Sequence, residues 1–136
     1  MNNLWQSISG FPNFALYFVL GLALLVVFVA VHAYLTAYRE LRMIRDGNVA
    51  AAISLSGAVL GFVLPLSSAV AHSVNPIDMI AWSVIAFVAQ MIVYLAVNRL
   101  VPHFSEAIRD GKIAPATLLA TLAVAVGVLN AACLTY

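Results

Sequence analysis

Few side chains in this sequence could do chemistry, and those deepest in its apolar stretches carry no charge. Gln90 lies near the middle of one stretch, and its amide can both donate and accept hydrogen bonds. The other candidates lie near the ends of two further stretches and are Ser67, Ser68, Asn130 and Cys133. Such groups could line a polar passage or bind a ligand, or they could only join helices by hydrogen bonds.

The sequence lacks the residue patterns that catalysis requires. His32, His72 and His103 lie at different levels of the predicted fold, and the single cysteine precludes an intrachain disulfide. We find no Ser/His/Asp arrangement, zinc-ligand spacing or phosphate-binding glycine loop. No acidic or basic residue lies in the middle of an apolar stretch, which argues against proton relay through carboxylates. We therefore predict no enzyme activity, no cofactor and no metal site.

Membrane-spanning helices must position these polar groups. Of 136 residues, 65% are hydrophobic and 8% charged, whereas soluble domains contain roughly 45–50% apolar and 25% charged residues. Four apolar stretches are each longer than the roughly 20 residues that a spanning helix needs, and they cover residues 14–36, 49–71, 79–100 and 113–134. They lack the strict alternation of a membrane β-barrel. We predict an all-α integral membrane protein with four transmembrane helices in one domain, residues 1–136.

The six basic residues predict the topology. They occupy two loops only, with Arg39, Arg42 and Arg45 in the first and Arg99, Arg109 and Lys112 at or within the second. Because positive charge is retained on the cytoplasmic side, both loops should be cytoplasmic, with the N-terminus, central loop and C-terminus on the outer, periplasmic side. The formal net charge of only +1 argues against a nucleic-acid partner.

A short motif in each basic loop indicates an internal repeat. The sequence IRDG at residues 44–47 recurs 64 residues later, at residues 108–111. We predict two tandem helical hairpins, residues 14–71 and 79–134, which run parallel because each contains an even number of spans. The first helix of each hairpin should extend beyond the bilayer and end where Gly47 or Gly111 adopts the left-handed conformation. Alternatively, the two arginines of the motif could hold an anionic headgroup or partner.

The second span contains a pair of glycines and a proline that should affect helix packing and backbone hydrogen bonds. Gly57 and Gly61 have the small-xxx-small spacing, which indicates either packing between the hairpins or contact between copies in a homo-oligomer. Pro65 has no N–H to donate to the Gly61 carbonyl, and we predict a helix break there. The freed carbonyl needs another partner, such as Ser67, Ser68, a neighbouring helix or water.

The remaining polar groups should face protein or water. For Gln90, Thr117 and Thr121 of the fourth span are candidate partners. Asn130 lies at nearly the depth of Pro65 in the other repeat, so it could converge with Ser67, Ser68 and Cys133. These groups then form either interhelical hydrogen bonds or a polar passage.

Two stretches of the sequence resemble a known family. Residues 56–69, SGAVLGFVLPLSSA, and residues 130–136, NAACLTY, resemble the bacterial YjfL family of inner-membrane proteins of unknown function. The resemblance covers essentially the whole chain and implies location in the bacterial inner (cytoplasmic) membrane. It supplies no catalytic residues. Some such proteins are encoded beside relatives of glutathionylspermidine synthase and of the membrane-stress protein PspA, which implies envelope maintenance or polyamine-related physiology.

Two functions remain open from the sequence. The first is a non-enzymatic envelope-maintenance or membrane-stress module that acts as a homo-oligomer in the lipid bilayer and recruits a cytoplasmic protein partner. The concentration of charge on two loops favours it. The second is a small oligomeric channel for ions or small polar solutes, which the uncharged polar groups and the proline favour.

Overall fold

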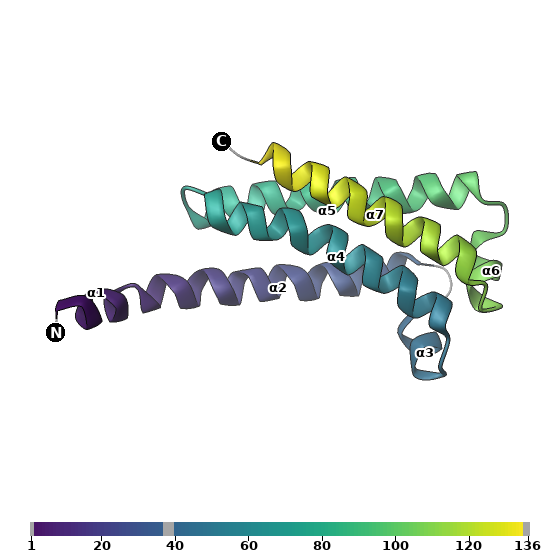
Figure 1. Cartoon of the computed structure of the whole chain (residues 1–136), viewed down its shortest axis with the longest axis horizontal. Coiled ribbons are helices and arrows are strands. Elements are labelled where there is room, and N and C mark those ends of the chain that lie inside the picture. Colours follow the sequence, from purple (N-terminus) through teal and green to yellow (C-terminus); the bar gives the residue numbers. More distant parts are fainter. Residues whose placement is uncertain (1, 37–39, 135–136) are drawn as a thin grey trace.

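The computed structural model describes residues 2–36 and 40–134, and within them the chain forms helices and no strands (Figure 1). Four helices are long and apolar enough to span a membrane, as predicted. The helices are α1 (Asn2–Ser9), α2 (Phe11–Leu35), α3 (Glu40–Arg45), α4 (Val49–His72), α5 (Pro76–Leu100), α6 (Phe104–Arg109) and α7 (Ile113–Cys133). The spanning helices are α2, α4, α5 and α7, and the first span also includes α1.

Local sequence explains where two of the spanning helices begin. The side chain of Asn48 accepts a hydrogen bond from the N–H of Ala51 at the start of α4, and Asn75 accepts from Asp78 at the start of α5. Asparagine is among the best residues for this position because its oxygen satisfies an N–H that has no helical partner. Pro76 follows at the first position of α5, where its missing N–H carries no penalty.

The ends of α2 and α5 at the two basic loops differ from the prediction. The first helix of each predicted hairpin does not continue into the loop: α2 ends at Leu35 and α5 at Leu100, and each is followed by a separate six-residue helix, α3 or α6. The predicted extension of the first span to Gly47 falls partly outside the described residues, at positions 37–39. A continuous helix would carry the loop residues straight away from the bundle, whereas a separate short helix can turn back and bury an apolar face against it.

The glycines of the repeated motif adopt the predicted left-handed conformation, but they end the short helices α3 and α6 and not the long ones. Gly47 has a φ of 90° and Gly111 a φ of 77°. After α3, the N–H of Gly47 donates to the Ile44 carbonyl and that of Asn48 to the Met43 carbonyl, and the same two bonds close α6. This pattern is a Schellman motif at both sites. The starts of α3 and α6 lie 64 residues apart, as do those of α4 and α7.

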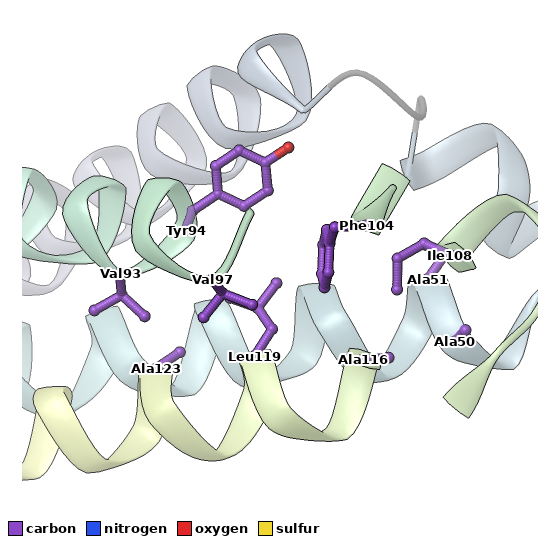
Figure 2. Close-up of a cluster of buried hydrophobic side chains, with 10 residues drawn as sticks. All are labelled: Ala50, Ala51, Val93, Tyr94, Val97, Phe104, Ile108, Ala116, Leu119 and Ala123. Atoms are coloured by element: carbon purple, nitrogen blue, oxygen red, sulfur yellow. The ribbon is translucent and has the colours of Figure 1, made fainter. Parts of the chain in front are cut away.

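The central helix of the bundle is α4, which packs against α5 and α7, while α2 lies along one side (Figure 1). In the most apolar part of α4, 50% of the residues are buried within the protein, whereas in the most apolar part of the first span only 6% are. Figure 2 shows one of two clusters of buried apolar side chains, in which Phe104 and Ile108 of α6 pack against α4 and α5. The short helix α6 therefore docks on the end of the bundle through apolar contacts.

Candidate functional site

Gln90 forms a buried polar bridge in the middle of the bundle. Its side chain is 3% exposed, and its Nε2 donates to the Gly61 carbonyl of α4 at 3.0 Å and to the Ala123 carbonyl of α7 at 3.1 Å. The two carbonyls fix the orientation of the Gln90 amide. If the amide were flipped, its oxygen, which can only accept, would face two other acceptors. The Oε1 atom is buried and has no hydrogen-bond partner among the described residues.

Pro65 explains why the Gly61 carbonyl requires this donor. In a helix that carbonyl would accept from the N–H of residue 65, which proline lacks. The break predicted at Gly61 and Pro65 does not end the helix, since α4 continues through Pro65 to His72. The missing bond is replaced by Gln90 of a neighbouring helix rather than by a serine. Thr117 instead donates to the Ile113 carbonyl of its own helix, and Thr121 is exposed.

The glycines of α4 lie in the contact with α7. A methyl group added at Gly57 would overlap the backbone of Ala120, and one at Gly61 would overlap the carbonyl of Ala123. Gly127 of α7 lies equally close to Gly61. Both glycines of the small-xxx-small motif therefore pack within the chain, which is the first of the two interpretations of this motif.

The polar residues near the C-terminal ends of α4 and α7 do not converge as a group. Ser68 donates from its Oγ to the Ala131 carbonyl of α7 at 3.0 Å, which joins α4 to the residue after Asn130. Asn130 is half-buried, whereas Ser67 and Cys133 are exposed. Ser67 lies on a groove of about 480 Å³ between α2 and α4, whose other lining residues are Tyr17, Phe18, Gly21, Leu22, Leu25, Val63, Leu66, Val70 and Ala71.

The two basic loops form one surface. The Asn48 side chain caps α4 and also donates from Nδ2 to the Ile108 carbonyl at 2.8 Å, so it ties the turn after α3 to the end of α6. A shallow depression of about 360 Å³ lies where the two IRDG motifs meet. The exposed basic residues of this end are Arg42, Arg45, Arg99, Arg109 and Lys112, and Arg39 lies outside the described residues.

One cluster was missed by sequence reasoning. His32 of α2 and Glu40 of α3 lie with Nδ1 and Oε2 3.1 Å apart, and their side chains are 2% and 0% exposed. Ser54 of α4 donates to the other carboxylate oxygen at 3.3 Å. A continuous helix would place residues eight apart about 12 Å apart along its axis, so the predicted extension excluded this contact. The available signal was a single glutamate among the arginines of the first loop.

Comparison with known proteins places the chain in a family. A family model described as Domain of Unknown Function (DUF350) matches residues 6–134. The chain belongs to the DUF350 family. No solved structure matches it significantly.

Two relatives show what this DUF350 protein is similar to. It is 37% identical over 123 residues to the UPF0719 inner membrane protein YjfL of Escherichia coli (strain K12), covering 90% of this chain and 93% of the relative. It is 29% identical over 104 residues to the UPF0719 transmembrane protein YshE of Bacillus subtilis (strain 168), covering 76% of each chain. The family resemblance and the inner-membrane location expected from the sequence are thus confirmed.

Proposed function

We propose that this inner-membrane protein is a non-enzymatic module that presents a basic cytoplasmic surface to a protein partner in envelope maintenance or membrane stress. The observation that carries the proposal is the Asn48 bridge, which joins the two basic loops at one end of the bundle. Residues from distant parts of the sequence thereby form a single surface with a fixed shape. A loop that only obeyed the charge rule for topology would not need such a connection.

The proposed topology comprises two parallel tandem hairpins with both termini periplasmic. Figure 1 supports it, because the two chain ends and the α4–α5 turn lie towards one end of the bundle, and α3 and α6 lie at the other. The repeated Schellman motifs and the 64-residue offset between helix starts support a duplicated hairpin. The basic surface then faces the cytoplasm.

The basic surface suits an acidic protein partner. Arg42 and Arg45 extend from α3, and Arg109 and Lys112 flank the turn after α6. Asp46 and Asp110 lie within the same turns, so the surface alternates in sign and can select a partner by charge pattern. A bare polybasic patch that binds anionic lipid would need no such alternation.

Self-association is the second part of the proposal. Because Gly57 and Gly61 already pack against α7, we assign the contact between copies to α2. That helix has the highest mean hydropathy of the four spans, and most of its large apolar side chains are exposed. Crosslinking between cysteines placed at Val19 and Val26 of α2, with cysteines at Ile85 and Ile92 of α5 as the matched control, tests this assignment. Equal or stronger crosslinking through α5 contradicts it.

The recruitment test uses charge reversal with a charge-preserving control. A photo-crosslinking residue at exposed Leu41 should form a protein adduct in intact cells. Arg42→Glu with Arg109→Glu should abolish the adduct, whereas Arg42→Lys with Arg109→Lys should retain it, since attraction to an acidic partner depends on sign. Thermal unfolding of the purified variants checks that the membrane domain is intact. An adduct that survives charge reversal, or that contains only lipid, overturns the proposal.

A small oligomeric channel is the second candidate. It rests on exposed Ser67, which with Tyr17 carries the polar side-chain groups of the otherwise apolar groove between α2 and α4, so the rest of a polar path would come from a second copy of the chain. The bundle interior is filled at the level of Gln90, so a conducting path would run along α2 or between copies. Purified protein in liposomes should then conduct ions, and Ser67→Trp should block the flux while Ser56→Trp, at an exposed position on the same helix, should not. Absence of flux from oligomeric wild-type protein removes this candidate.

A further inference from the structure

A buried ionisable pair holds α3 against the bundle. Glu40 is reached from two other helices, with the His32 imidazole at one carboxylate oxygen and the Ser54 hydroxyl at the other. Neither His32 nor Glu40 has more than 2% of its side chain exposed. Ionisable residues so deeply enclosed in a membrane protein are costly to retain, and they mark functional sites more often than structural ones.

Aromatic rings close the site towards the membrane. The ring of Phe28 lies 5.6 Å from the His32 imidazole and stacks on Phe62 at 4.4 Å. Phe87 of α5 meets Phe28 edge-on at 5.3 Å. Since these rings cover the side of the pair that faces the middle of the bundle, a proton would reach the pair from the loop end.

The groups that face the pair from other helices are few. From α5, the ring of Tyr94 lies 5.7 Å from His32 and rises towards α2 (Figure 2). From α6, Phe104 meets Tyr94, while Glu106 of that helix is exposed and lies 3.6 Å from exposed His103. The arginines of α3 that the structure describes point outward. The titratable groups enclosed with Glu40 in the described part of the chain are thus His32 and Tyr94.

The second repeat shows that docking a short helix does not require a carboxylate. The position 64 residues after Glu40 is Phe104, which begins α6 and is 1% exposed. Phe104 packs there among buried apolar side chains of α4, α5 and α7. Since an apolar side chain in such a site is usually at least as stabilising as an ion pair, stability does not explain why the first repeat carries Glu40.

We propose that His32 and Glu40 form a proton-binding site that controls the docking of α3. With one proton between them the pair is neutral overall. A second proton leaves a net positive charge, and loss of the proton leaves a net negative one, and either charge is costly where no water reaches it. Because both side chains are enclosed, a proton enters or leaves when α3 moves away from α4. The ligand is a proton from the side of the basic loops.

Undocking of α3 would change the basic surface, since Arg42 and Arg45 lie on this helix. This consequence rests on the proposed function, but the site itself does not. The test of the site therefore needs no partner protein. If the proton site is disproved, the result of the recruitment experiment still stands, and if no partner is recruited, the result for the proton site still stands.

The docking test compares the isoleucines of the two IRDG motifs, of which Ile44 is half-buried and Ile108 is fully buried. In protein with Cys133→Ser, Ile44→Cys reports on α3 and Ile108→Cys on α6, each measured by maleimide labelling in nanodiscs, where both faces are accessible. The ratio of the two rates cancels the pH dependence of the thiol itself. We expect the ratio to be lowest in one pH window and to rise on each side by up to about tenfold per pH unit, because each opening is linked to one proton.

Two variants separate a proton site from a structural contact. Glu40→Gln keeps the size and polarity of the side chain but cannot titrate, and Glu40→Phe copies the second repeat. Because His32 can still take up a proton in both variants, each should lose the rise of the labelling ratio on the alkaline side and keep a rise only on the acidic side. A ratio that varies with pH as much in Glu40→Gln as in the wild type overturns the proposal, and so does a wild-type ratio that is constant across the range.

The proton can also be observed directly. The sequence contains two glutamates, Glu40 and Glu106. In Glu106→Gln protein with carbon-13 glutamate, the infrared carbonyl band of a protonated carboxyl therefore reports on Glu40 alone. We expect this band to change over the same pH range as the labelling ratio, and to change over a different range in His32→Gln. A band that changes where the labelling ratio stays constant contradicts the coupling of proton binding to α3.

Discussion

Gln90 supplies to Gly61 the hydrogen-bond donor that Pro65 removes. The Nε2 atom of Gln90 lies 3.0 Å from the Gly61 carbonyl oxygen, and both groups are buried. The same nitrogen donates to the Ala123 carbonyl, so one amide connects α5 to α4 and α7 in the middle of the bundle. A polar residue and a proline that each look unfavourable in a membrane helix are thus compatible because they lie together.

Removal of this donor should destabilise the protein. Gln90→Leu keeps the side chain buried but leaves the Gly61 carbonyl without a donor, which should lower the free energy of unfolding by about 1–3 kcal/mol. Pro65→Ala restores a backbone N–H in α4, so Gln90→Leu should cost less in that background, by about 0.6 kcal/mol or more. Unfolding in mixed micelles measures both effects. Equal costs of Gln90→Leu in the two backgrounds would show that the pair is not coupled.

The α4–α7 contact depends on the absence of side chains at three positions. Alanine at Gly57, Gly61 or Gly127 would place a methyl group inside the backbone of the facing helix, so the helices must separate. We expect each substitution to lower the free energy of unfolding by about 1–3 kcal/mol. Gly21→Ala is the matched control, because the nearest atom to its new methyl would be the Met79 Cε at 3.7 Å. Comparable losses at Gly21 would be inconsistent with close packing as the cause.

The two Schellman glycines give a purely conformational prediction. No atom lies within 4 Å of a methyl group built on Gly47 or Gly111, so alanine there meets no neighbour. Its cost should come from the positive φ alone and amount to about 1 kcal/mol at each site. Asparagine tolerates this conformation better, so Gly47→Asn should cost less than Gly47→Ala. Thermal unfolding of the matched pair checks the order, and the reverse order would exclude backbone strain as the cause.

Composition and sequence motifs predicted the features that depend only on residues close together in the sequence. The four spans follow from apolar stretches of bilayer length, and the left-handed glycines follow from the repeated motif, because both are local properties. The partners of Gln90 could not be predicted, since three helices must be in place before its amide meets two carbonyls. The contact between His32 and Glu40 required a bend between them, and nothing in the spacing of the two residues indicates one.

The proposed topology can be tested with single cysteines at the two ends of the bundle. With Cys133 replaced by serine, Val74→Cys places a thiol in the exposed α4–α5 turn, and Glu106→Cys places one on the exposed face of α6. Because basic loops stay cytoplasmic, a membrane-impermeant maleimide added to intact spheroplasts should label Val74→Cys and should reach Glu106→Cys only after permeabilisation. The opposite pattern would place both termini in the cytoplasm and would turn the basic surface away from any cytoplasmic partner. Labelling of both sites in sealed cells would mean that the chain inserts in two orientations. We do not expect this result, because the basic residues are confined to two loops on one side.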